Sequence, residues 1–228
     1  MKKLVCLFLS FCLVFSLTLT VSASTISNNT STQYDITTVS INGNLLEVPV
    51  MKSAPILSSN GVISSTQTVF VPDGSTDSLA RNKVVVSEIK QYGAPRTRGY
   101  GDFYVNGYIW FHSTLNYTTV TRSGVTYYDL ISFMLEREVY VESVFNSFQK
   151  ANAHIMQIGA DYIDDDVISI NQEDEYQIEY GTLYAVPASW MPVYNVGYFI
   201  GVEYSVLIDY NNDLNLTDYV LTYIHQAV

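Results

Sequence analysis

The sequence predicts an all-β protein: an antiparallel β-sandwich, of the meander or jelly-roll kind, with an N-terminal signal peptide and a mostly irregular N-terminal segment. Turn signals separate successive apolar or alternating stretches at short spacing, which indicates antiparallel neighbours. Tyrosine is abundant, with 19 residues, and suits a pleated, half-buried surface. No long helical pattern alternates with the predicted strands, which argues against a parallel α/β architecture.

The first 23 residues have the pattern of a secretory signal peptide. A basic start at Lys2 and Lys3 precedes an apolar run over residues 4–21, and the small-residue pattern Val-Ser-Ala ends at Ala23. The run is near the minimum of about 17 residues that spans a bilayer, so an uncleaved anchor is the alternative. The cleavage pattern, with no basic stop after it, favours removal.

Removal of this peptide leaves an acidic chain without cysteine. Both cysteines, Cys6 and Cys12, lie inside the apolar run. A cysteine-free exported protein with a short Lys-Lys start suggests a bacterium with a single membrane. The net charge changes from −11 to −13, because two of the 11 Lys and Arg leave and all 22 Asp and Glu stay. This charge argues against nucleic acid and anionic lipid as partners.

The mature chain divides by composition into three parts. Residues 24–40 are rich in Ser, Thr and Asn, which predicts a flexible leader. Residues 41–82 predict a short hairpin around the Asn-Gly pair at 42–43 and an otherwise mostly irregular segment broken by prolines. Strand then follows strand from 83 to 228, and this part predicts the sandwich domain itself.

The strands of the sandwich are predicted from alternation and from the turns between them. Three valines at 84–86 open the region. A second Asn-Gly pair, at 106–107, predicts a hairpin between residues 102–105 and 108–111. The second arm continues to 121 and turns at 122–124, and the later strands are expected over 125–144, 153–163, 176–186, 196–209 and 216–227.

Two of these stretches have informative periodicity. Residues 129–148 gather six apolar side chains near one helical face, whereas a period of two lines one strand face with apolar residues that include Phe133 and Leu135. The valines and the second pattern favour a strand, with a helix as the alternative. Residues 198–208 alternate more clearly, which predicts a strand with one buried face.

An aromatic patch is the strongest candidate for a ligand site. Its members are Phe103, Tyr108 and Trp110, because pairing across a two-residue turn sets Phe103 opposite Trp110 and puts Tyr108 on the same side. Exposed Trp and Tyr can stack on sugar rings or anchor a partner protein. The alternative is that a second layer covers this side and makes it part of the core.

A second tryptophan, Trp190, lies between two prolines and is therefore expected in a loop. A loop tryptophan is a plausible ligand contact. The alternative, which is the more common arrangement, is that it closes one end of the core.

One acidic turn is a weak candidate for calcium. Oxygen ligands stand at positions 1, 3, 5 and 7 of a calcium-type loop, but the sixth position is Leu214 instead of Gly and the twelfth is Val220 instead of Glu. Asp and Asn are also ordinary turn residues. The four candidate ligands are Asp209, Asn211, Asp213 and Asn215.

No spacing in the chain is a strong catalytic or cofactor signature. Carboxylates on one predicted strand face would suit an acid and a nucleophile for sugar hydrolysis, but such a row is ordinarily the solvated side of a strand. These carboxylates belong to Glu136, Glu138 and Glu142. The chain has three histidines, His112, His154 and His225, and they form no close-spaced pair of the kind that binds a metal. The sequence has no nucleophile elbow and no phosphate-binding glycine loop, so no cofactor is predicted.

These observations favour a secreted, non-enzymatic β-sandwich that binds an extracellular ligand, either a glycan or a protein, or that contributes to the cell surface. The alternative is a secreted toxin or antimicrobial protein that oligomerises on a target membrane, because long strands rich in Ser, Thr and Tyr can rearrange to span a bilayer. The negative charge counts against this alternative. An extracellular hydrolase is the third choice.

The first prediction concerns processing. Because the small-residue pattern ends at Ala23, mass spectrometry of the secreted protein should show an N-terminus close to Ser24. An intact Met1 end in a membrane fraction would contradict this expectation.

Overall fold

The computed structural model describes residues 32–41, 44–96, 107–139, 149–163, 166–194, 199–208 and 219–227. The predicted signal peptide over 1–23 lies outside these ranges. The strands are β1 (Gln33–Ile41), β2 (Asn44–Lys52), β3 (Ile56–Leu57), β4 (Ile63–Pro72), β5 (Tyr108–Arg122), β6 (Val125–Val139), β7 (Gln149–Ile163), β8 (Asp166–Ile178), β9 (Leu183–Ala185), β10 (Val193–Tyr194), β11 (Ile200–Ile208) and β12 (Tyr219–Gln226). Helix α2 (Thr76–Tyr92) stands between β4 and β5.

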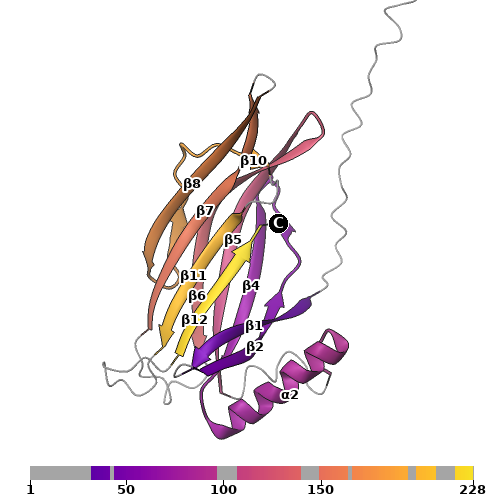
Figure 1. Cartoon of the computed structure of the whole chain (residues 1–228), viewed down its shortest axis with the longest axis vertical. Coiled ribbons are helices and arrows are strands. Elements are labelled where there is room, and N and C mark those ends of the chain that lie inside the picture. Colours follow the sequence, from indigo (N-terminus) through magenta and orange to yellow (C-terminus); the bar gives the residue numbers. More distant parts are fainter. Residues whose placement is uncertain are drawn as a thin grey trace, which may run out of the picture.

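The described strands form one antiparallel, 12-stranded sheet with the order β10-β6-β5-β4-β2-β1-β12-β11-β7-β8. The sheet folds over into two layers: β12, β11, β7 and β8 face β4, β5 and β6, and β1 and β2 join the layers along one side (Figure 1). The main core lies between these layers and contains residues from both. The prediction of an all-β antiparallel sandwich is confirmed.

On the side away from β1 and β2, the short strand β10 bridges the two layers. It pairs with β6 through Val193 and Tyr194, and its Tyr194 also pairs with Ala160 of β7. Next to β10, strand β9 pairs with β6, and the N–H groups of Gly181 and Val186 donate to carbonyls of β6. The chain that follows β8 therefore covers the outer edge of β6 between Tyr127 and Leu135.

Two of the predicted turns are confirmed by strand pairing. Ile41 pairs with Asn44, so β1 and β2 form the hairpin predicted at 42–43, a pair of residues that itself lies outside the described ranges. Arg122 pairs with Val125 across Ser123 and Gly124, which both have positive φ, at 49° and 80°. Two such residues match the right-handed twist of the flanking strands.

The prediction of a flexible leader over residues 24–40 is wrong from residue 33 onward, where strand β1 begins. Strand β1 pairs with β2 along its whole length and with β12 at its end. Its Val39 is fully buried in the main core, and Tyr34 and Ile36 pack beneath α2. The polar composition misled the prediction because threonine, although polar, has a high preference for strands.

The expected domain boundary at residue 83 is also absent from the described sheet. Residues 41–82, which contain β2 and β4, were expected to form a short hairpin and to be mostly irregular otherwise. Strands β2 and β4 pair with each other, and β4 pairs with β5 over ten residue pairs. Residues 33–72 therefore contribute strands to the same sheet as the later part of the chain.

The valines at 84–86 lie in helix α2 and not in a strand, so this prediction is wrong. Ser75 caps the helix by accepting a 3.2 Å hydrogen bond from the backbone N–H of Ser78. Gly93 ends it in the left-handed conformation with φ 74°, and its N–H donates to the carbonyl of Ile89. Caps at both ends outweigh the weak strand preference of three valines.

Helix α2 covers the outer side of β1, β2 and β4 (Figure 1). Its Asn82 donates 2.7 Å to the carbonyl of Glu47, and its Lys90 forms an ion pair with the Glu47 carboxylate. Under the helix lies a second apolar cluster, which we call the helix-covered cluster: Met51, Phe70, Val85, Ile89, Tyr108 and Trp110.

The pairing predicted around the second Asn-Gly pair is wrong for Trp110. Its register partners are Phe70 of β4 and Glu138 of β6, so both edges of β5 are occupied and Phe103 cannot be its partner. Residues 97–106, Phe103 among them, lie outside the described ranges. The alternation is nevertheless as predicted, because Tyr108 and Trp110 join the helix-covered cluster while Ile109 and Phe111 face the main core.

The strand interpretation of 129–148 is confirmed as far as residue 139, and the rest lies outside the described ranges. Phe133 and Leu135 are buried as expected. The register shifts where Asn116 pairs with Ser132 and Tyr117 pairs with Leu130, so Ile131 is the extra residue of a β-bulge. Ile131 is consequently 37% exposed, and Leu130 takes its place in the core.

The helix-covered cluster generates the second prediction. Trp110 is only 2% exposed, so Trp110→Ala should leave a cavity and lower the free energy of unfolding by about 3–5 kcal/mol. Chemical denaturation of the variant measures this loss.

Leu45→Ala is the control, because Leu45 is 80% exposed. This variant should change the free energy of unfolding by no more than about 0.5 kcal/mol. Equal losses in the two variants would contradict the burial of Trp110.

Candidate functional site

The aromatic residues proposed from the sequence lie mostly inside the protein. The Trp110 ring packs edge-on against Phe70 at 5.1 Å and against His112 at 5.7 Å. Tyr108 is 1% exposed, and burial raises the pKa of its hydroxyl. Their packing beneath α2 favours the core interpretation of this side of β5, and Phe103 lies outside the described ranges.

Trp190 lies in the loop between β9 and β10, as expected. It is half-buried, packs against the main core and donates its backbone N–H to the Pro187 carbonyl at 3.0 Å. The loop is held to the sheet by Gln172, which accepts from the Met191 N–H at 2.6 Å and donates to its carbonyl at 2.9 Å. These contacts favour the interpretation that Trp190 closes one end of the core.

The acidic candidates are not brought together in the described ranges. The possible calcium ligands from Asp209 to Asn215, and Glu142, lie outside those ranges. Glu136 and Glu138 are exposed on β6, and Glu138 contacts His112 at 3.4 Å. Among the residues that are described, no group of three or more His, Cys, Asp or Glu has the arrangement of a metal site.

A polar cluster that sequence reasoning missed lies inside the main core; we call it the interior polar cluster, formed by Ser65, Gln67, Ser113, Tyr223 and His225. The fully buried His225 ring contacts Ser65 Oγ through Nε2 and Ser113 Oγ through Nδ1, both at 3.0 Å. The Tyr223 hydroxyl donates to Gln67. Because β12 carries the histidine and β4 and β5 carry the serines, the cluster links the two layers.

This cluster has the elements of a nucleophile and a base but not their setting. Ser113 and His225 are fully buried and Ser65 is 7% exposed, so a substrate has no route to them in this conformation. Burial, with a smaller contribution from the charge of Lys52, lowers the pKa of His225 to about 3. A neutral ring donates at one nitrogen and accepts at the other, which two hydroxyls can satisfy. The arrangement fits a structural role.

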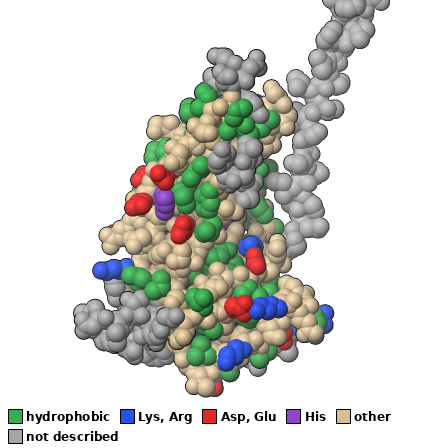
Figure 2. Space-filling view, viewed as in Figure 1, with side chains coloured by type: hydrophobic (Ala, Val, Ile, Leu, Met, Phe, Trp, Pro, Cys, Tyr) green, Lys and Arg blue, Asp and Glu red, His purple; other side chains and the backbone are tan. Residues whose placement is uncertain are grey.

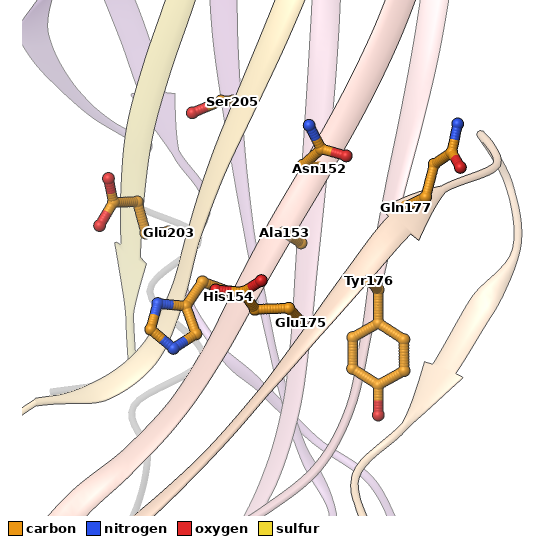
Figure 3. A pocket seen from close by; sticks show the side chains of 8 residues that line it. All are labelled: Asn152, Ala153, His154, Glu175, Tyr176, Gln177, Glu203 and Ser205. Carbon is orange, nitrogen blue, oxygen red and sulfur yellow. The ribbon is translucent and has the colours of Figure 1, made fainter.

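An open depression lies on the outer face of β7, β8 and β11; we call it the outer hollow. Its volume is about 520 Å³. Figure 3 shows the residues that line it: Asn152, Ala153, His154, Glu175, Tyr176, Gln177, Glu203 and Ser205. Ala153 and Tyr176 pack against the main core, so the side chains that project outward are the polar ones.

Strand register places an imidazole between two carboxylates in this hollow. His154 of β7 pairs with Glu203 of β11 on one side and with Glu175 of β8 on the other. Side chains directly opposite on neighbouring strands lie about 5 Å apart at Cβ. The three residues therefore form a row across three strands, which we call the Glu-His-Glu row.

A further carboxylate reinforces the negative charge of this face. Glu173 accepts a 3.0 Å hydrogen bond from His154 Nε2, and both side chains are partly exposed. Figure 2 shows acidic side chains gathered around a histidine on the face that β7 and β8 present to the viewer. The outer hollow is thus polar, open to solvent and acidic.

The sequence contained a partial signal for this site. Glu203 lies on a correctly predicted strand, and His154 was considered only as a metal ligand. Glu173 and Glu175 were missed because residues 166–175 were not expected to form a strand. An alternation of Glu with other residues is the signal that would have placed them on one face.

Comparisons with protein-family models, curated proteins and solved structures find no match to this chain. Within the described ranges, no helix has the length and apolar character needed to cross a membrane.

The interior polar cluster generates the third prediction. Because folding lowers the pKa of His225 from 6.5 to about 3, the folded state favours the neutral ring. The stabilisation is complete above about pH 6.5 and is lost as the pH falls towards 3. Between about pH 6.5 and 4 the free energy of unfolding should fall by roughly 3 kcal/mol on account of this residue.

Denaturation curves across this pH range, compared with those of His225→Gln, measure the contribution. The variant should lack this part of the acid-dependent loss. His154→Gln is the matched control and should retain it, since His154 lies on the outer face. Identical pH profiles for the wild type and His225→Gln would contradict the prediction.

Proposed function

We propose that the chain is a secreted, non-enzymatic binding protein that takes an extracellular ligand, a glycan or a protein, on the outer hollow. The Glu-His-Glu row is the observation that carries this proposal, because it concentrates hydrogen-bonding groups on one rigid surface. Secretion is supported by the signal-peptide pattern that ends at Ala23.

The hollow suits a ligand that is rich in hydrogen-bond donors. Carboxylates accept hydrogen bonds, and Asn152 and Gln177 at its rim can both donate and accept. Hydroxyl groups of a sugar and the Lys or Arg side chains of a protein meet this requirement. A ligand with a negative charge would be repelled by Glu173, Glu175 and Glu203.

The supporting strands favour binding without a large rearrangement. Strands β7, β8 and β11 pair without a register shift where they carry the row, and their inner faces pack into the main core. A preformed surface spares the ligand the cost of ordering the site.

The open shape of the hollow favours binding over catalysis. Its carboxylates lie on the outer face of the sheet, and the described residues around them include no lid. Enzymes that hydrolyse a substrate generally close their sites and exclude water from the reacting groups. The interior polar cluster, which has a histidine and two serines, is closed to solvent instead.

The fourth prediction tests this function with two matched double variants. We expect the labelled protein to bind a glycan on an array or a component of a cell-surface extract. Glu175→Gln/Glu203→Gln should weaken that binding about tenfold, because it removes two charged acceptors from the hollow.

Glu136→Gln/Glu138→Gln removes the same charge from β6 in the other layer and should leave binding unchanged. Equal loss in both variants would show that net charge alone is responsible and would contradict the proposal. Leakage of liposomes on addition of the protein would instead support the toxin alternative.

A further inference from the structure

Strand β8 has an edge that no other strand covers in the described structure. It pairs with β7 through 13 residue pairs and stands at the end of the strand order. Near its C-terminal end, the Tyr184 hydroxyl donates to the Gln177 carbonyl, which occupies the edge there. The stretch before this contact, residues 167–175, is what we call the β8 edge.

The β8 edge lacks several of the features that usually protect an edge from further pairing, and its charged residues, Glu173, Asp174 and Glu175, all lie in its C-terminal half. Its pairing with β7 shows no register shift, so no bulge twists it away. The stretch contains no proline, glycine or lysine. Natural edge strands are ordinarily short, or interrupted by such residues, because a regular edge exposes a row of N–H and C=O groups that can pair with another chain.

The side chains along the edge differ between its two halves. On the outward face, Val167 is 59% exposed and is followed by the uncharged Ser169 and Asn171. Glu173 and Glu175 continue the same face and are exposed. An added strand would therefore meet an apolar residue at one end and two carboxylates at the other.

A second copy of this chain fits the edge poorly. In an antiparallel pair of β8 edges that overlap over residues 167–175, Glu175 would lie opposite Val167 and Glu173 opposite Ser169. Neither carboxylate gains a cationic partner in that register. Shifting the pair by two residues towards the acidic half sets Glu173 opposite Glu173 across the two-fold axis, and like charges directly opposite are destabilising. Each copy also carries a net negative charge, −11 for the whole chain and −13 without the predicted signal peptide.

We propose that the β8 edge binds an extended segment of another protein as an added antiparallel strand, with Lys or Arg opposite Glu173 and Glu175. Main-chain hydrogen bonds would supply affinity, and the alternating side chains would supply specificity. The cation opposite Glu175 extends the Glu-His-Glu row to a fourth strand. The inference rests on the proposed function and names a protein strand, and not a glycan, as the ligand.

The fifth prediction uses a synthetic nine-residue peptide, KTKTTVTVV, as the probe. In antiparallel pairing its two lysines lie opposite Glu175 and Glu173, and its last valine lies opposite Val167. The control peptide ETETTVTVV reverses the two charges. Fluorescence anisotropy of labelled peptides should show that wild-type protein binds the lysine peptide about tenfold more tightly than the control.

Charge reversal on the protein should reverse this preference. Glu173→Lys/Glu175→Lys should favour ETETTVTVV, whereas Glu136→Lys/Glu138→Lys on β6 should still favour KTKTTVTVV. Equal affinity of the wild type for the two peptides, or no binding of either at about 1 mM, would overturn the proposal.

Backbone methylation separates strand addition from simple charge attraction, and it needs only the wild-type protein. In one peptide the odd-numbered amide nitrogens are methylated, and in the other the even-numbered ones. An added strand presents alternate N–H groups to the edge, so one peptide should lose binding and the other should keep it. Equal binding of both would overturn the proposal.

The outcomes also separate this inference from the proposed function. If Glu175→Gln/Glu203→Gln loses binding to a glycan while neither peptide binds, the hollow is a ligand site and the strand-addition inference alone fails. If the peptides behave as expected, the partner class is established for the same acidic face.

Discussion

The contact between His225 and the two serines is the constraint on which the arrangement of the layers depends. A buried polar ring must find partners, and here they come from β4 and β5 across the core. A slip of β12 by one residue would turn His225 outward and break its hydrogen bonds to both hydroxyls. Because Val202 of β11 pairs with His225, the same contact fixes where Glu203 stands, and hence the row on the outer face. The interior of the sandwich thus sets the geometry of its surface.

Two separate apolar clusters stabilise the sheet on either side of β5. The main core fills the space between the layers, while α2 closes the helix-covered cluster against β1, β2 and β4. This explains why both faces of β5 are apolar. From the sequence alone, the side with Tyr108 and Trp110 could be either a ligand surface or a face covered by a second layer. The helix is that second covering, and it is attached through hydrogen bonds and an ion pair to Glu47. An aromatic strand therefore need not indicate a binding site.

Local turn chemistry made the hairpins predictable, whereas long-range pairing did not follow from it. The alternation over 200–208 identified a strand with one buried face, and every even residue from Ile200 to Ile208 is buried. The valines at 84–86 led to a wrong strand prediction, because the residues that cap the helix, Ser75 and Gly93, lie several residues away from them in the sequence. Residues 166–175 were missed because an edge strand with one solvated face is rich in polar residues. The outer hollow could not be predicted, since its members meet only through the pairing of three strands that are separate in sequence.

The short strand β10 limits how this protein can assemble. It joins β6 to β7, and β9 pairs with part of β6, so the longest open edge among the described strands is that of β8. A molecule with a single open edge can end a stack of strands but cannot extend one. Pairing through the β8 edge would therefore favour a one-to-one complex over a fibre of stacked chains.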